Sequence, residues 1–362
     1  MPDCIIVGGG VIGLLTARKL FLEGVDVLLL EKGPLGGESS WAGGGIISPL
    51  YPWRYDDSVN VLAQRSKNIY PDLCMQLSEE TGKDCELITS GLFTVIAEEE
   101  KAILDWAKTW SVDASFIDDV VSIRAIENRV GNVVDKGIWM PDVMQVRNPK
   151  FVEALKASFE FLSIPYKEHT PVEELVVKDN KVCGVRTSHG IISTDKVIIA
   201  SGAWSAQFSE TQASVDVVPV KGQMIMYKGE PGLVKRIVLS EGHYIIPRRD
   251  GRILAGSTLE KIGFDKTIST DALAELHDAA IELIPLLSDL EVERQWAGLR
   301  PGTEKGIPYI CQHDEVENLY VHAGHFRNGI VLGAASAELM TDIVLERMPW
   351  CDVSPYDMKA QH

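Results

Sequence analysis

The chain has 362 residues, of which 45% are hydrophobic and 24% are charged. This composition is that of a soluble globular protein, long enough for two lobes and a large core. Its formal net charge of −17 argues against nucleic acid or an anionic membrane as a partner.

Targeting and redox signals are few. No apolar run reaches about 18 residues without a glycine or a charge, so the sequence predicts no membrane-spanning helix. The first predicted strand begins at residue 4, which leaves no room before it for a signal peptide, and we expect a cytoplasmic protein. The six cysteines form no C-x-x-C pair and are expected to be reduced, mostly structural thiols.

The start of the chain carries the parts of a nucleotide-binding βαβ unit, in order. An apolar strand over residues 4–7 leads to Gly8, Gly10 and Gly13, spaced as G-x-G-x-x-G, and a helix is predicted over 11–23. The first glycine permits a tight turn, the second lets a pyrophosphate approach the backbone, and the third lets the helix pack closely on the strand. The free N–H groups at the helix N-terminus would then face the phosphates.

Glu31 completes this unit at the end of a second buried strand over 26–30, about 20 residues past the glycines. A carboxylate there accepts hydrogen bonds from the ribose of adenosine and repels a 2′-phosphate, which disfavours NADP. No second G-x-G-x-x-G occurs, so we expect no separate nicotinamide site. An enzyme of this kind would take electrons directly from its substrate.

The segments that follow divide into two patterns. One continues the nucleotide-binding region, with helices over 151–162 and 328–346, apolar strands over 196–200 and 319–323, and a hairpin of 173–177 and 184–187 around Asp179-Asn180. The other has strands without crossover helices over 217–227, 243–248, 252–257 and 293–300, a turn at Asp250-Gly251, and an amphipathic helix over 271–287 that would cover one sheet face. We therefore expect an α/β region interleaved with a mainly antiparallel sheet, and a ligand between them.

Several longer motifs occur in order along the chain. They are Leu30-Glu31-Lys32, residues 37–46 (GESSWAGGGI), 48–55 (SPLYPWRY), 245–248 (IIPR), 296–302 (WAGLRPG) and 324–329 (GHFRNG). In these motifs, and over nearly its full length, the chain resembles the D-amino acid oxidase, glycine oxidase and sarcosine oxidase family of flavoproteins. It is most similar to the glycine oxidases linked to thiamine synthesis.

The resemblance implies a fold and a cofactor. The fold would be a Rossmann-like FAD-binding domain of the GR2 type, over 1–80, 145–215 and 318–362, interleaved with a mainly antiparallel substrate-binding domain over 81–144 and 216–317. The FAD would be non-covalent. Relatives that tether flavin through cysteine carry that residue near Pro301 or Gly302, and Cys311 lies too far along the chain to match.

The resemblance also implies a set of cofactor-binding residues. They are Gly8, Gly10, Val11, Ile12, Gly13, Glu31, Lys32, Ser39, Ser40, Gly43, Gly44, Gly45, Ile46, Val172, Ser201, Gly202, Trp204, His325, Arg327, Asn328, Gly329 and Ile330. In the family, the serines donate to phosphate, the triple glycine lets backbone approach the isoalloxazine ring, and the residue matching Val172 reads adenine. The last helix begins at Gly329, where its dipole would stabilise negative charge at N1–C2=O of reduced flavin. Without the resemblance, Ser39, Ser40 and the triple glycine could equally form a flexible surface loop.

Three residues are candidates for the substrate site. Arg300 ends an apolar strand, an unusual place for a purely structural charge, and its planar fork suits a carboxylate. Within the family it matches the carboxylate-binding arginine, Tyr244 matches a tyrosine that reaches the same carboxylate, and Arg327 matches a second arginine near the ring. On the residues alone, Tyr244 could be a half-exposed structural tyrosine, and Arg327 could form a salt bridge at the rim.

The reaction implied is oxidative deamination of glycine, and also of sarcosine and small D-amino acids, by hydride transfer from Cα to flavin N5. Its products are a 2-oxo acid, ammonia or an amine, and hydrogen peroxide, and thiamine thiazole synthesis is a possible destination. The implied partners are the amino acid and O2, with a homo-oligomer, tetrameric in many relatives. Two alternatives are a D-amino acid dehydrogenase that passes electrons to a quinone or partner protein, and a non-catalytic flavin-binding subunit. Retention of Tyr244, Arg300 and Arg327 together argues against the second.

Three further features carry weaker expectations. His322 and His325 lie three apart, but no cysteine or carboxylate cluster joins them, and we expect no metal. Trp41 and Trp53 could narrow the substrate pocket or could pack between the lobes. Residues 51–55 begin a loop, and the sequence leaves open whether it gates the site.

Overall fold

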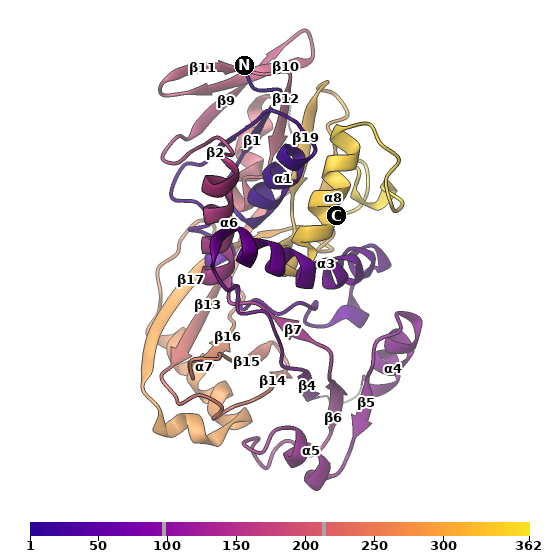
Figure 1. Cartoon of the computed structure of the whole chain (residues 1–362). Helices are drawn as coiled ribbons and strands as arrows, with labels where there is room; N and C mark the ends of the chain where they lie inside the picture. Colours follow the sequence, from indigo (N-terminus) through magenta and orange to yellow (C-terminus); the bar gives the residue numbers. More distant parts are fainter. Residues whose placement is uncertain (96–98, 212–214) are drawn as a thin grey trace.

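The computed structural model describes residues 1–95, 99–211 and 215–362, and Figure 1 shows them arranged in two lobes. The first lobe is built on a six-stranded sheet. Its strands, in spatial order, are β18 (Tyr309–Gln312), β19 (Leu319–Ala323), β12 (Lys196–Ile199), β1 (Cys4–Val7), β2 (Val27–Leu30) and β8 (Tyr166–Lys167). All neighbours are parallel except β18 and β19. The central strands are continuous apolar runs because both faces of the sheet are buried.

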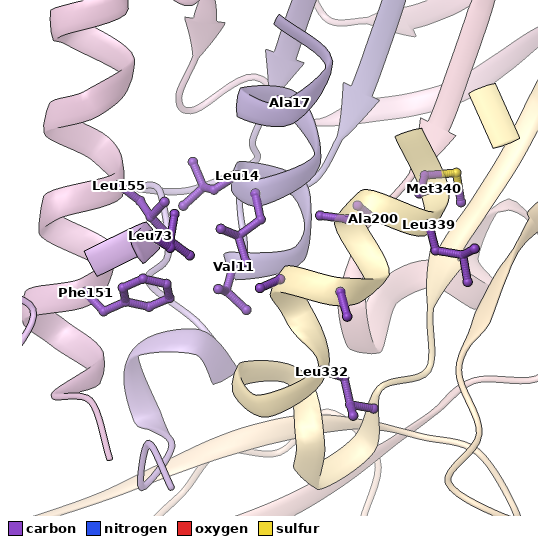
Figure 2. Packing of buried hydrophobic residues seen from close by; sticks show 14 of the residues in the cluster. Val11, Leu14, Ala17, Leu73, Phe151, Leu155, Ala200, Leu332, Leu339 and Met340 are labelled. Carbon is purple, nitrogen blue, oxygen red and sulfur yellow. The ribbon is translucent and has the colours of Figure 1, made fainter. Parts of the chain in front are cut away.

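Helices cover one face of this sheet. They are α1 (Val11–Leu22), α3 (Asp57–Thr81), α6 (Asn148–Leu162) and α8 (Gly329–Val344). Figure 2 shows Leu14 of α1 on the side of that helix that faces Phe151 and Leu155 of α6, and Leu332 of α8 belongs to the same buried cluster. This packing holds the N-termini of α1 and α8 against the same edge of the sheet.

A small antiparallel sheet covers the opposite face. It consists of β9 (Val172–Lys178), β10 (Lys181–Thr187) and β11 (Gly190–Ser193). Asp179 and Asn180 join β9 and β10 with φ of 50° and 58°, the left-handed conformation of a tight hairpin turn. The predicted hairpin is confirmed.

The second lobe is built on an eight-stranded sheet. Its spatial order is β17 (Val292–Gly302), β13 (Val218–Tyr227), β16 (Ile253–Gly256), β15 (His243–Pro247), β14 (Ile237–Ser240), β4 (Leu92–Val95), β6 (Gly137–Met140) and β5 (Ser115–Ile117). Every neighbouring pair is antiparallel except β14 and β4. Helix α7 (Thr270–Leu283) packs on one face through Leu276, Ala280 and Leu283. The expected fold class, an α/β domain interleaved with a mainly antiparallel sheet, is confirmed.

Short elements complete the chain. They are α2 (Ser39–Ala42), η1 (Pro52–Arg54), β3 (Ile88–Thr89), α4 (Glu100–Thr109), α5 (Val120–Ile126), β7 (Met144–Gln145), η2 (Gly202–Thr211), η3 (Pro285–Asp289), η4 (Phe326–Asn328) and η5 (Ser354–Tyr356).

Three features differ from the expectations. The helix predicted over 271–287 ends at Leu283, because Pro285 disfavours helical backbone at Ile284, whose φ is −134°. Helix α3 was not predicted, although Asp56 caps its N-terminus and Gly82, with φ of 68°, ends it. Strand β18 pairs with β19 in the first lobe, so the second lobe's last segment ends before Tyr309 and not at 317.

Candidate active site

One cavity lies where the two sheets meet. The first lobe lines it with Gly8 and Glu31, which follow β1 and β2, and the second lobe lines it with Tyr244 of β15 and Arg300 of β17. The carboxyl ends of parallel strands are where open α/β sheets bind ligands. One side of the cavity is therefore the sheet edge at which α/β folds bind nucleotides, and the other side carries polar side chains from the second sheet.

The glycine turn after β1 leaves no space for side chains. Gly8 has φ of 115°, and a Cβ there would lie 2.4 Å from the carbonyl oxygen of Ala200. Gly13 does not line the cavity. A Cβ on it would lie 1.9 Å from the carbonyl oxygen of Gly8, so its hydrogen side chain is what lets α1 sit directly on the turn.

Ser40 is a residue of α2 whose hydroxyl lies against the N-terminus of α1. Its hydroxyl accepts a hydrogen bond from the Val11 N–H at 2.8 Å, and its carbonyl accepts one from Asn148 Nδ2 at 2.8 Å. Ser40 is buried and both Ser39 and Ser40 lie in α2, so this segment is not a flexible surface loop. A hydroxyl at a helix N-terminus is a suitable neighbour for a phosphate.

Glu31 is held rigidly by backbone groups. Its carboxylate accepts hydrogen bonds from the Gly9 N–H at 2.6 Å and the Gly33 N–H at 2.8 Å, and the side chain is buried. These bonds fix the carboxylate where β2 meets the cavity, and its binding to a ribose stays a prediction.

A segment of the second lobe crosses over this end of the cavity. Phe264 stacks on Trp204 with ring centroids 5.5 Å apart, and Lys266 pairs with Glu38 at 2.9 Å. Lys32 Nζ lies 3.0 Å from the centroid of the Trp204 ring. Partial burial lowers the pKa of Lys32, and the carboxylates of Glu38 and Glu31 oppose that shift.

Arg248 braces the triple glycine, a role that we did not predict. Its Nη2 donates to the Gly44 carbonyl at 2.7 Å, and its Nη1 donates to Gln145 Oε1 at 2.6 Å and to the Val146 carbonyl at 3.0 Å. Burial lowers the pKa of Arg248 to about 10. Neighbouring Gly45 has φ of 77°, and a Cβ there would lie 2.1 Å from the Val146 carbonyl oxygen. An arginine at the end of an apolar strand, the signal used for Arg300, could have identified it.

Arg300 presents a guanidinium that has no ion-pair partner among residues 1–95, 99–211 and 215–362. Its Nη2 donates to Ser257 Oγ at 2.7 Å, and its Nη1 donates to the Thr258 carbonyl at 3.1 Å. Gly222 makes room for it, since a Cβ there would lie 2.2 Å from Nη1. Burial lowers the pKa of Arg300, and Arg327 acts in the same direction. A partly buried cation that is held by neutral groups is suited to an anionic ligand.

Tyr244 and Arg327 complete this wall. Tyr244 is buried, and its hydroxyl lies 3.6 Å from Met224 Sδ, a weak acceptor. Arg327 makes no ion pair within the described ranges and lies over the ring of Phe326. The expectation that Tyr244 could be half exposed is wrong, and no salt bridge at the rim holds Arg327 in the described chain.

Three residues that line this cavity each have a buried polar side-chain atom with no partner in the described parts of the chain. The atoms are His322 Nε2, Arg327 Nε and Asn328 Nδ2. Burying unpaired polar atoms is costly, so these atoms indicate a polar ligand. Together with the glycine cradle, they fit FAD: phosphates at the glycine turn and ring near the start of α8.

All but one of the predicted cofactor and catalytic residues line the cavity, the exception being Gly13. Lining residues that the sequence did not indicate include Gly222, Met224, Ser257, Gly298, Pro301, His322 and Phe326. Gly222, Met224 and Ser257 lie far in sequence from Arg300 and Tyr244, and strand pairing brings them to the cavity, whereas Pro301 and Phe326 are sequence neighbours of Arg300 and Arg327. Cys311 packs with Tyr309 and Val321 and is absent from the lining.

The loop over residues 51–55 is held by hydrogen bonds from Tyr51 and from Trp53. Tyr51 Oη accepts from the Gly242 N–H at 2.7 Å, and Trp53 Nε1 donates to Glu99 at 3.1 Å, the carboxylate that also pairs with Arg54. Trp53 and Trp41 do not line the cavity, and Trp41 instead meets Trp296 edge to face at 5.8 Å. The packing interpretation of both tryptophans is therefore the one that the contacts favour.

Two features are absent from residues 1–95, 99–211 and 215–362. These residues contain no group of three or more His, Cys, Asp or Glu side chains that could hold a metal ion. They also contain no helix that is both long and apolar enough to cross a membrane.

Comparison with known proteins gives a consistent result. A family model described as FAD dependent oxidoreductase matches residues 3–343. The glycine oxidase of Pseudomonas aeruginosa is 44% identical over 354 residues, which cover 97% of each chain. The bifunctional protein ThiO/ThiG of Trichormus variabilis is 31% identical over 95% of this chain and 53% of its own length. The crystal structure of glycine oxidase from Geobacillus kaustophilus superimposes with a TM-score of 0.94 at 29% identity, covering 99% of this chain and 98% of that one.

Proposed function

The chain belongs to the FAD dependent oxidoreductase family, and on that premise we propose that it is an amino acid oxidase whose main substrate is glycine. Sarcosine and small D-amino acids are further substrates. The products are a 2-oxo acid, ammonia or an amine, and hydrogen peroxide. When bound, FAD supplies the two-electron acceptor that takes a hydride from the substrate Cα and returns the electrons to O2.

Arg300 carries the substrate assignment. Its side chain is partly buried, has no carboxylate partner in the described chain, and lines the same cavity as the glycine turn. A substrate carboxylate would accept hydrogen bonds from the remaining N–H groups of Arg300, and the Tyr244 hydroxyl would add another. These bonds would fix the position of the substrate α-carbon, and such alignment is the main contribution of the protein to hydride transfer.

The charge of the site also favours the reactive form of the amine. Arg300 and Arg327 place two cations beside the substrate, and like charge lowers the pKa of a bound ammonium. A neutral amine can release a hydride from Cα, whereas an ammonium cannot. No side chain is then required as a dedicated base.

The start of α8 would act on the cofactor. Gly329 begins this 16-residue helix at the cavity, so its free N–H groups and dipole favour negative charge there. Gly8, Gly10, Ser40 and Glu31 would hold the pyrophosphate and adenosine at the opposite end. Binding is non-covalent in this proposal, because Cys311 lies outside the cavity lining.

Cellular setting is proposed by similarity alone. Likeness to the ThiO/ThiG protein supports a role in thiamine thiazole synthesis. We place the enzyme in the cytoplasm as a homo-oligomer, tetrameric as in many relatives, with a small amino acid and O2 as its partners.

A substrate panel tests the proposal. Glycine, sarcosine, D-alanine and D-proline are supplied to the purified yellow protein, and oxygen uptake and peroxide release are followed together. We expect both with glycine. Bleaching of the flavin without oxygen uptake would instead identify a dehydrogenase with a quinone or protein acceptor, and no bleaching by any amine would identify a non-catalytic flavin protein.

A further inference from the structure

The guanidinium of Arg300 is held by residues next to a different strand from its own. Arg300 lies on β17, the edge strand of the second sheet, and β13 separates β17 from β16. Its side chain crosses β13 at Gly222, where a Cβ would lie 2.2 Å from Nη1 and from Nη2. The acceptors beyond β13 are the Ser257 hydroxyl and the Thr258 carbonyl, which follow directly after β16. These two residues therefore set where the guanidinium lies.

The bonds to these acceptors leave only part of the guanidinium for a ligand. An arginine side chain has five N–H hydrogens. Nη1 of Arg300 donates to the carbonyls of Thr258 at 3.1 Å and Lys221 at 3.4 Å, and Nη2 donates to Ser257 Oγ at 2.7 Å. Both hydrogens of Nη1 and one of Nη2 are then used. In the described chain, the hydrogens left for a carboxylate are those on Nε and the second one on Nη2.

The segment after β16 carries one extra residue relative to β13. Gly256 pairs with Met224, and Glu260 forms a bridge with Lys221, so one strand advances by four residues while the other advances by three. This is the residue count of a β-bulge, a feature that re-aims side chains and is frequent next to active sites. The extra residue falls where the chain meets the guanidinium of Arg300.

Glu260 ties this segment to β13. Its Oε1 accepts hydrogen bonds from Thr258 Oγ1 at 2.5 Å and from Gln223 Nε2 at 2.9 Å, and its Oε2 pairs with Lys221 Nζ at 3.1 Å. Burial raises the pKa of this carboxyl, but the three hydrogen bonds outweigh burial and lower the pKa overall, so the group stays charged. Thr258 Oγ1 also accepts from the Gln223 N–H at 2.9 Å. Ser257 belongs to the cavity lining of the described chain, whereas Glu260 does not.

We propose that Ser257 and Thr258 are positioning residues for the substrate, whose two acceptors orient the Arg300 guanidinium before a carboxylate binds. Glu260 in turn fixes Thr258. A long side chain that is oriented in advance loses less conformational entropy when its ligand arrives, so these acceptors strengthen carboxylate binding without touching the carboxylate. The inference rests on the proposed function, because it requires Arg300 to bind the carboxylate of the substrate.

Two conservative variants test the proposal in the yellow holoenzyme. Ser257→Ala removes the acceptor of Nη2, and Thr258→Val removes the hydroxyl that Glu260 holds while keeping the shape of the side chain. We expect each variant to raise KM for glycine about five- to tenfold and to lower kcat less than about threefold. Thr258→Ser, which restores the hydroxyl, should recover most of the loss. Ser288→Ala, at an exposed serine outside the described cavity lining, is the control.

Acetate gives a second readout that needs no oxidation, because it shares the carboxylate of glycine but has no amine. Its dissociation constant is measured from the change in flavin absorbance, beside that of FAD itself. We expect Ser257→Ala and Thr258→Val to weaken acetate by about the factor by which they raise KM, and to change FAD binding less than about twofold.

Two results would overturn the proposal. Unchanged acetate binding in both variants would show that Arg300 needs no such support, and equal weakening of FAD and acetate would show that the segment only shapes the scaffold. A wild type that binds no acetate would overturn the carboxylate role of Arg300 together with the proposal. A wild type that binds acetate but takes up no oxygen with glycine would refute only the proposed function, and the acetate comparison would still decide on Ser257 and Thr258.

Discussion

The two ends of the cavity are built in different ways. At the nucleotide end, the chain offers backbone: the turn at Gly8 and the start of α1, with the Glu31 carboxylate held by two N–H groups. At the substrate end it offers side chains, with Arg300 and Tyr244 carried by two strands of the second sheet. The first end comes from one short stretch of sequence and the second is assembled by sheet register. A side chain added at the glycine turn should therefore abolish FAD binding. Loss of a side chain at the substrate end should reduce turnover and leave FAD bound.

The largest effect is expected at the glycine turn. Gly8→Ala places a Cβ 2.4 Å from a backbone oxygen at a φ of 115°, so the turn must move and FAD binding should be lost. Gly24→Ala is the matched control, because Gly24 has φ of 89° but no atom within 4 Å of a Cβ. The control should lose about 1 kcal/mol of stability and stay yellow. Flavin absorbance after gel filtration measures both, and a yellow Gly8→Ala protein would contradict the backbone account.

Removal of Arg300 tests the other end. Arg300→Ala should keep its FAD and lose more than about 100-fold in kcat/KM for glycine, since the substrate carboxylate would be buried without its partner. Steady-state oxygen uptake measures the loss. Arg294→Ala on the same strand, an exposed arginine over the Trp41 ring outside the cavity lining, is the control. A near-normal rate in Arg300→Ala would remove this residue from the role.

Arg248 braces the triple glycine, and its loss should destabilise this part of the site. Arg248→Met leaves the Gly44 and Val146 carbonyls and the Gln145 amide oxygen without a donor, at a cost of about 2–4 kcal/mol. Arg249→Met next to it breaks only an exposed pair with Asp84 and should cost less than about 1 kcal/mol. Urea unfolding compares the two variants. Equal stabilities would show that the brace on the triple glycine is unimportant.

Acid should weaken the first lobe before any carboxylate titrates. Burial lowers the pKa of His325 to about 3, and it lowers that of His322 in the same direction. Between pH 6.5 and that value the unfolded chain binds protons that the native chain excludes, so stability falls as pH falls. From pH 7 to pH 5 the loss for His325 is about 2 kcal/mol. Urea unfolding of wild type and His325→Gln at the two pH values checks this, and a variant that loses as much stability as the wild type between them would refute it.

The smallest effect is expected at the segment of the second lobe that carries Phe264 and Lys266. Lys266 and Glu38 form a partly exposed pair, so Lys266→Ala should weaken FAD by less than about twofold at physiological salt. Trp204→Ala, which removes the ring between Lys32 and Phe264, should weaken it more. Fluorescence titration with FAD ranks the two. The reverse order would show that the Lys266–Glu38 pair contributes more to FAD binding than the packing of the Trp204 ring.

The same contrast explains what the sequence could predict. The nucleotide end was accessible because its signals are local: glycine spacing, helix period and a carboxylate all lie within the first 31 residues. Arg300 was accessible because a charge at the end of an apolar strand is unusual. Arg248 carries the same signal, but its partners are three oxygens from distant segments, which no spacing reveals.

Residues that reach the cavity through strand pairing could not be predicted from the sequence. Gly222 faces Arg300 because β13 pairs with β17, and the pairing of Val220 with Arg300 sets that register. Helix α3 was missed because Pro71 interrupts its pattern. His322 contacts Thr16 of α1, a residue more than 300 positions away, so no local pattern in the sequence predicts this contact.

The central claim is that one cavity holds FAD at its backbone end and a glycine carboxylate at Arg300. The most direct test is anaerobic addition of glycine to the purified wild-type and Arg300→Ala proteins, with flavin absorbance as the readout. We expect both proteins to be yellow and only the wild type to be bleached. A colourless wild type, or equal bleaching of the two proteins, would contradict the account.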